Sequence, residues 1–173
     1  LALIAEPTIG IITNVGTSHI ELLGSQEAIA EAKGELIRCL GPDSVAILNE
    51  DDHFVKAMSS IAEGKTVTYG IHSNATVIGS HLRYKKDGIK FTCKCYDEVF
   101  DVFLPMIGEH NVYDALAAIA AGRVLGVKSS KIKKGLSDFT GTPMRQEIVA
   151  FEDIVILNDA YNANPSSMSE SIK

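Results

Sequence analysis

The sequence contains no tryptophan, and its aromatic residues amount to only 6%. It also has no apolar run close to the roughly 20 residues that a membrane-spanning helix needs, so we expect no contact with a membrane. A signal peptide is not recognisable at its start, which makes a cytoplasmic location the default expectation. Cysteine is scarce too: the odd set Cys39, Cys93 and Cys95 forms no metal-type cluster. These residues are interpreted as free thiols in a reducing compartment.

Positive charge is in short supply. Lysine and arginine number 16 against 22 aspartate and glutamate residues, which gives a net charge of −6. A nucleic-acid-binding protein usually presents a basic surface, so the composition argues against nucleic acid as a partner. An anionic substrate would need local cations or a metal ion to offset the general repulsion.

What remains is an ordinary globular composition, with 46% hydrophobic residues in a chain of 173. This length suits one domain. The chain starts without methionine inside an apolar run, and it stops in what resembles the opening of a helix. We therefore expect the single domain 1–173 to be truncated at both ends.

Strand and helix patterns alternate along most of the chain. Apolar, β-branched runs predict buried strands at 9–14, 45–49, 67–69 and 153–158. Helical patterns cover 25–40, with Ser25 as N-cap, as well as 51–62, 110–125 and 130–138. At the start of the helix 51–62, Asp51 and Asp52 would favour the positive end of the helix dipole.

The segment 75–104 differs, because it alternates apolar and polar residues around a hairpin turn at 86–88. The expected fold is α/β: a mostly parallel sheet flanked by helices, with an antiparallel meander at about 75–104.

Three predicted strands end in polar residues: Asn14, Asn49 and Asn158 followed by Asp159. In open α/β sheets, ligands bind beyond the carboxyl ends of the strands. The alternative is that Asn and Asp simply begin turns there. For the three together we favour a ligand-binding edge.

Lys33 is the most informative single residue. On a helical wheel at ~100° per residue it falls among apolar side chains, whereas the acidic residues of the same helix fall opposite. A buried ammonium is costly unless it is paired or neutralised. Either Lys33 extends its amine to solvent or to a buried acid, or it is chemically altered or faces a charged site.

Other polar residues also permit two interpretations. His19, in the loop after the first strand, could ligate Mg²⁺ or make ordinary hydrogen bonds. Asn111 and Asp114 lie three apart on one helix face, where they could cap the helix or meet a ligand. Arg145 could hold a phosphate or a surface carboxylate. Residues 63–66 imitate a phosphate-binding loop, but Ser59 replaces the required glycine, so the chain has no such loop.

Five segments together resemble the central domain of Mur ligases: 12–21, 24–25, 32–36, 108–118 and 159–165. The last of them is similar to the D-alanyl-D-alanine-adding branch of the family in particular. The resemblance covers essentially the whole chain and implies a nucleotide-binding fold of the phosphate-loop NTPase type.

The resemblance also implies an activity. Such ligases use ATP and Mg²⁺ to phosphorylate the terminal carboxylate of a UDP-N-acetylmuramoyl tripeptide, and the amine of D-alanyl-D-alanine then attacks the acyl phosphate. The catalytic residues would be Lys33 and His19. The remaining implied contacts are to nucleotide (Asn111, Asp114, Arg145, Asp159, Asn162), to substrate (Asn14, Thr17, Ser18, Tyr161, Asn164) and to metal (His19 and a carbamylated Lys33). The protein would be a monomer.

The sequence also departs from the family pattern. Asp114 stands where many relatives have asparagine, and the phosphate loop, an upstream acidic metal ligand and both neighbouring domains are absent from this chain. We therefore expect these 173 residues alone to be inactive. The competing hypotheses are another Mur-type or polyglutamate ligase, a non-catalytic nucleotide-binding module, and a structural fragment that binds nothing.

Overall fold

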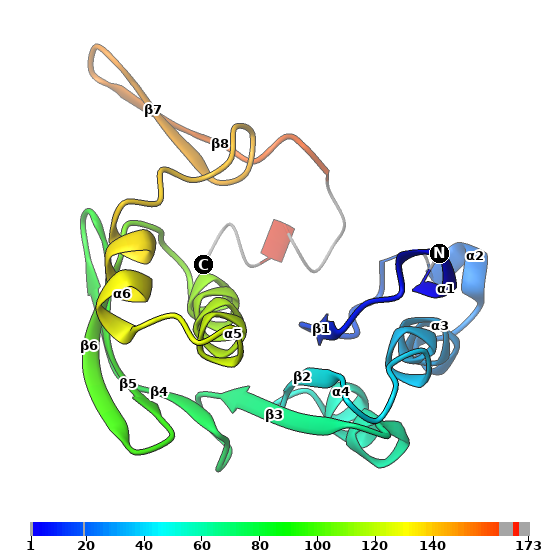
Figure 1. The fold of residues 1–173 in the computed structure, drawn as a ribbon. Helices are drawn as coiled ribbons and strands as arrows, with labels where there is room; N and C mark the ends of the chain where they lie inside the picture. Colours follow the sequence, from blue (N-terminus) through cyan, green and yellow to red (C-terminus); the bar gives the residue numbers. More distant parts are fainter. Residues whose placement is uncertain (1, 19, 163–167, 170–173) are drawn as a thin grey trace.

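The fold is built on a single curved sheet of six strands, seen in a computed structural model that describes residues 2–18, 20–162 and 168–169 (Figure 1). The strands follow one another across the sheet in sequence order: β1 (Ile9–Ile12), β2 (Val45–Asn49), β3 (Lys65–Gly70), β4 (Val77–Lys85), β5 (Gly88–Cys95) and β6 (Glu98–Leu104). The pairs from β1 to β4 are parallel, and those from β4 to β6 are antiparallel. The predicted parallel sheet with an antiparallel meander is therefore confirmed.

Helices precede β1 and fill the connections from β1 to β2, from β2 to β3 and from β6 to the hairpin that follows: α1 (Ala2–Ala5), α2 (Ile20–Leu23), α3 (Gln26–Arg38), α4 (His53–Ala57), the 3₁₀ helix η1 (Met58–Ile61), α5 (Glu109–Val124) and α6 (Ser129–Ser137). In the part of the chain that the structure describes, none of them is both long and apolar enough to cross a bilayer.

Two apolar cores lie on the two faces of the parallel strands, and β2 contributes to both. Because successive side chains of a strand point to opposite faces, Ile47 packs with α5 and the meander, whereas Ala46 and Leu48 pack with α3 and α4. All three are almost completely buried. This explains why β2 is continuously apolar up to Leu48 and not alternating.

Local signals set where α3 and α4 begin. The Ser25 hydroxyl accepts the N–H of Ala28 at 3.1 Å, which confirms it as the N-cap of α3. The helix predicted at 51–62 is divided into α4 and η1, and Asp52 caps it by accepting the N–H groups of Phe54 and Val55, both at 3.0 Å. Asp51 does not belong to this helix; its carboxylate turns the other way, to partners described below.

The prediction for 153–158 was wrong in one respect. These residues do form a strand, β8 (Ile154–Asn158), but among the described strands it pairs with β7 (Glu147–Phe151) alone, in a separate antiparallel hairpin. Four of its five residues are exposed, and Figure 1 shows the hairpin, in orange, standing apart from the six-stranded sheet. An apolar run indicates that a strand tends to be buried. It does not indicate which other strand will pair with it.

Candidate functional site

The carboxyl ends of β1 and β2 are joined by hydrogen bonds at one edge of the sheet. The side-chain amide of Asn49 donates to the backbone oxygen of Thr13 at 2.9 Å. The carboxylate of Asp52 accepts the N–H of Val15 at 2.8 Å. Two of the three predicted polar strand ends thus meet, and they fix the loop after β1. The third, Asn158, ends the separate hairpin and does not belong to this edge.

Lys33 reaches this loop from α3. Its ammonium group donates to the backbone oxygen of Asn14 at 2.6 Å, and the residue is half-buried. A cavity of about 420 Å³ opens beside it, lined by Asn14, Gly16, Ser18, Leu23, Ile29, Ala32 and Lys33. The lysine therefore faces a partly polar cavity at the carboxyl edge of the sheet, and within the described residues its ammonium binds a backbone oxygen and not an acid of the core.

Three of the predicted residues, Asn14, Ser18 and Lys33, line this one cavity. Thr17 lies exposed between Gly16 and Ser18. His19 lies outside the described residues, as does Asn164. In the described part of the chain, no three His, Cys, Asp or Glu side chains come together in a metal-binding group.

A second group of predicted residues is held together by Gln146. The side-chain oxygen of Gln146 accepts from the amide of Asn111 at 2.9 Å and lies 2.9 Å from Nε2 of His110. The backbone N–H of Gln146 donates to the carboxylate of Asp159 at 3.2 Å. One residue thus joins the start of α5 to the end of β8.

Arg145, the residue before Gln146, stacks on an aromatic ring. Its guanidinium carbon lies 4.0 Å from the centroid of Tyr161, in a cation–π arrangement. The residues on either side of it, Met144 and Gln146, both have left-handed backbone conformations, with φ of 61° and 52°. Such conformations are uncommon outside glycine and cluster at functional loops.

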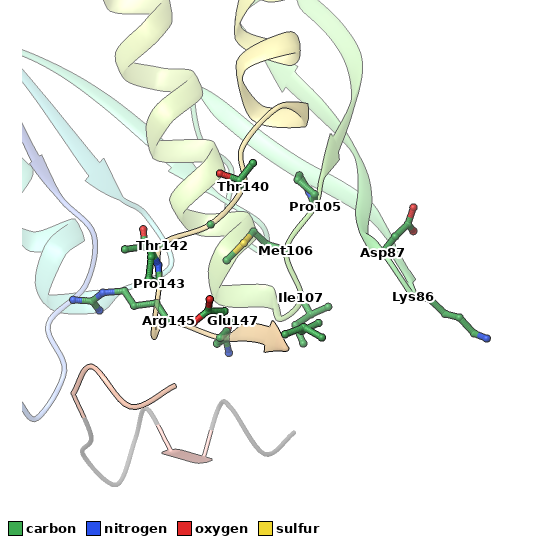
Figure 2. A pocket seen from close by; sticks show the side chains of 13 residues that line it. Lys86, Asp87, Pro105, Met106, Ile107, Thr140, Thr142, Pro143, Arg145 and Glu147 are labelled. Carbon is green, nitrogen blue, oxygen red and sulfur yellow. The ribbon is translucent and has the colours of Figure 1, made fainter. Parts of the chain in front are cut away.

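A second cavity of about 460 Å³ lies beside this group. Its lining includes Pro105, Met106 and Ile107 from the loop before α5, Thr140 to Pro143 with Arg145 and Gln146 from the loop before β7, and Glu147 and Ile148 at the start of β7. Figure 2 shows Met106 between these two loops, with Lys86 extending away from the cavity on one side and Arg145 on the other. The cavity combines apolar walls with hydroxyl, amide and carboxylate groups.

Asp114 and Asn162 are less closely involved. Asp114 lies one turn after Asn111 on α5 and is open to solvent, but desolvation by neighbouring protein atoms raises the pKa of its carboxyl group, against a smaller lowering by His110. Asn162 is exposed at the end of the described segment that carries Tyr161. Their predicted roles stay predictions.

Sequence reasoning missed Gln146 and gave Asp51 the wrong role. The Asp51 carboxylate accepts three hydrogen bonds: from the N–H groups of Ile71 at 2.6 Å and His72 at 3.0 Å, and from the hydroxyl of Tyr113 at 2.9 Å. Burial opposes its ionisation, but these bonds and the Ser73 hydroxyl prevail and lower its pKa to about 2. The sequence did contain a signal for this role. Two acids, Asp51 and Asp52, follow the strand, and a helix needs only one of them as its cap.

Comparison with known proteins shows the family of this chain. Residues 1–122 match the Mur ligase middle domain. A UDP-N-acetylmuramoyl-tripeptide–D-alanyl-D-alanine ligase of Bacillus subtilis (strain 168) is 39% identical over 100% of this chain, which spans 37% of that protein's length. A structure of MurF from Acinetobacter baumannii superposes with a TM-score of 0.92 at 30% identity, over 98% of this chain and 37% of the other.

A MurF ligase from Thermotoga maritima in complex with ADP has the same fold, with a TM-score of 0.86 at 23% identity over 98% of this chain and 39% of the other. The family match covers well over half of the described fold, from α1 through most of α5. The chain belongs to the Mur ligase family.

Proposed function

We propose that this chain is the central, nucleotide-handling part of an ATP-dependent ligase that adds D-alanyl-D-alanine to a UDP-N-acetylmuramoyl tripeptide in cell-wall synthesis. The observation that carries the proposal is the group around Gln146, which gathers Asn111, Arg145, Asp159 and Tyr161 beside one cavity. The matched relatives are nearly three times as long as this chain, so a phosphate-binding loop and the neighbouring domains would come from outside it. A monomeric, cytoplasmic protein is part of this proposal.

The cavity beside Gln146 would hold the base and ribose of ATP. Its volume of about 460 Å³ lies in the range of small-ligand sites. Met106, Ile107 and Pro143 offer apolar surface for a planar base, and the Asn111 amide donates to Gln146, which lines the cavity. The Arg145 guanidinium, held by Tyr161, would meet a phosphate. A ligase of the same fold from Thermotoga maritima forms a complex with ADP.

The Lys33 cavity would hold the reacting groups. The tripeptide carboxylate takes the terminal phosphoryl group of ATP and releases ADP. The free amine of D-alanyl-D-alanine then attacks the acyl carbon, and the tetrahedral intermediate collapses to an amide as phosphate leaves. Such a reaction needs positioning and stabilisation of the negative charge. A lysine, backbone amides and the Ser18 hydroxyl at the end of β1 are suited to both tasks.

Mg²⁺ would neutralise phosphate charge at this edge. The described lining of the Lys33 cavity supplies hydroxyl, amide and carbonyl oxygens but no carboxylate. It therefore fits Mg²⁺, which keeps several waters and binds phosphate oxygens, only in part. Carbamylation of Lys33 would add the missing anionic oxygen, and His19 would add a further ligand; both assignments are proposals.

The test is ATP-dependent phosphate release by the full-length polypeptide that carries this chain, with UDP-N-acetylmuramoyl tripeptide, with and without D-alanyl-D-alanine. Lys33→Ala is compared with Lys94→Ala, which removes an exposed lysine from β5. We expect release that requires the dipeptide, survives in the control and falls at least about 100-fold in Lys33→Ala.

If phosphate release did not depend on D-alanyl-D-alanine, the proposal would be wrong, and another amide ligase of the family would be the better description. If no release occurred, a non-catalytic nucleotide-binding module would be the better description.

A further inference from the structure

Helix α5 begins without a side-chain cap. Its N-cap residue is Gly108, which has no side chain to satisfy the free N–H groups of the first turn. The first two turns are held instead by contacts of their own side chains. Asn111 donates to the backbone oxygen of Ile107 at 2.5 Å, and Tyr113 donates its hydroxyl to Asp51 at 2.9 Å.

Asp51 is well placed to hold α5, because it is itself held on two sides. It lies two residues after the carboxyl end of β2, and it accepts backbone N–H groups from the loop between β3 and β4. Gly70 leaves room for it: a Cβ atom there would lie 2.9 Å from the Asp51 carboxylate. Three segments that are far apart in sequence thus meet at one carboxylate.

The bond between Tyr113 and Asp51 is also chemically strong. A hydroxyl that donates to an ionised carboxylate forms a charge-assisted bond, about twice as strong as a neutral one. Burial, together with this bond to Asp51, raises the pKa of the Tyr113 hydroxyl, which is a donor at neutral pH even at its ordinary pKa. Tyr113 lies two residues after Asn111 on the same helix.

We propose that Asp51 is a positioning residue: through Tyr113 it fixes the first turns of α5, and thereby holds the Asn111 amide where a nucleotide base is bound. The role of Asn111 in this inference rests on the proposed function, whereas the contact between Asp51 and Tyr113 does not. Asp51 touches neither substrate nor phosphate in this scheme. Its effect would appear in base recognition and not in the chemical step.

The first measurement is hydrogen–deuterium exchange, which needs no ligand. Tyr113→Phe removes only the hydroxyl, and Asp51→Asn keeps an acceptor oxygen. The matched control is Tyr84→Phe, which removes an exposed hydroxyl that donates to Glu109, also on α5, at the longer distance of 3.4 Å. We expect faster exchange at the start of α5 in Tyr113→Phe, a smaller change in Asp51→Asn, none in the control, and unchanged exchange in α3.

The second measurement is nucleotide dependence in the full-length polypeptide. Loss of one such bond predicts a KM for ATP about 5- to 20-fold higher in Tyr113→Phe, with kcat changed less than about threefold. The ratio of KM values for GTP and ATP should fall, because the base-reading amide is no longer fixed. A purely structural role would lower the melting temperature and leave this ratio unchanged.

The outcomes separate the two proposals. Unchanged exchange at α5, or faster exchange with an unchanged KM for ATP and base selectivity, would overturn the positioning role while the ligase function stands. A wild-type protein without any ATP-dependent release would overturn the ligase function, and with it the part of the inference that concerns the nucleotide.

Discussion

The contact between α5 and β4 gives a quantitative prediction about packing. Leu116 on α5 is completely buried and lies against Gly79 of β4. A Cβ atom at position 79 would meet Cδ1 of Leu116 at 3.1 Å, closer than the 3.5–4.0 Å at which carbon atoms attract best. The helix therefore approaches the sheet closely because residue 79 has no side chain.

The expected energies follow from this geometry. Leu116→Ala removes a fully buried side chain and should lower the free energy of unfolding by about 3–5 kcal/mol. Gly79→Ala should cost about 1–2 kcal/mol, since overpacking outweighs the lower entropy of the unfolded chain. In the double variant the new methyl group occupies part of the vacated space, so the combined loss should be about 1–2 kcal/mol smaller than the sum.

Urea denaturation at low protein concentration, followed by circular dichroism, measures this coupling in the wild type, the two single variants and the double variant. Ile37→Ala is the matched control, because Ile37 is equally buried but belongs to the core on the opposite face of the sheet. Its effect should add to that of Gly79→Ala within about 0.5 kcal/mol. If the losses caused by Leu116→Ala and Gly79→Ala also added within about 0.5 kcal/mol, our explanation of the close approach between α5 and β4 would be wrong.

Two further predictions concern titration. The pKa of Asp51 is about 2 in the folded chain against 3.8 ordinarily, so its contribution to stability is complete above pH 3.8 and is lost as the pH falls through 2. The difference in unfolding free energy between wild type and Asp51→Asn should therefore shrink by about 1–2 kcal/mol between pH 5 and pH 2, after allowance for solvent screening; a difference that stays constant would contradict the assignment. Burial also raises the pKa of the Cys93 thiol to about 12 and that of Cys95 less, whereas Cys39 is only half-buried. A thiol reagent should thus modify Cys39 first at pH 8, as mass spectrometry of the native protein would show, and prior modification of Cys93 or Cys95 would refute this.

Local signals predicted most of the fold because short-range chemistry determines those features. Ser25 caps α3 through a residue three positions away, and the turn at 86–88 joins two strands that it directly connects. The meander between β4 and β6 follows from alternation within each strand. None of these features depends on a distant part of the chain.

The parts that could not be predicted depend on long-range contacts. Asp51 bonds to residues 20 and 62 positions away, so its neighbours in sequence gave no indication of its role. The same holds for Gln146, which joins α5 to β8. The helical wheel placed Lys33 on the apolar side correctly, but only the fold shows that this side meets the loop after β1.

The exposed hairpin of β7 and β8 has a practical consequence for anyone who prepares this chain. Seven of its large apolar side chains are open to solvent: Ile148, Val149, Phe151, Ile154, Val155, Ile156 and Leu157. Strands of this composition with unpaired edges readily add to another copy of themselves. Produced alone, the 173 residues should aggregate through this hairpin in a concentration-dependent manner, and a lysine in place of Val155 should keep them in solution.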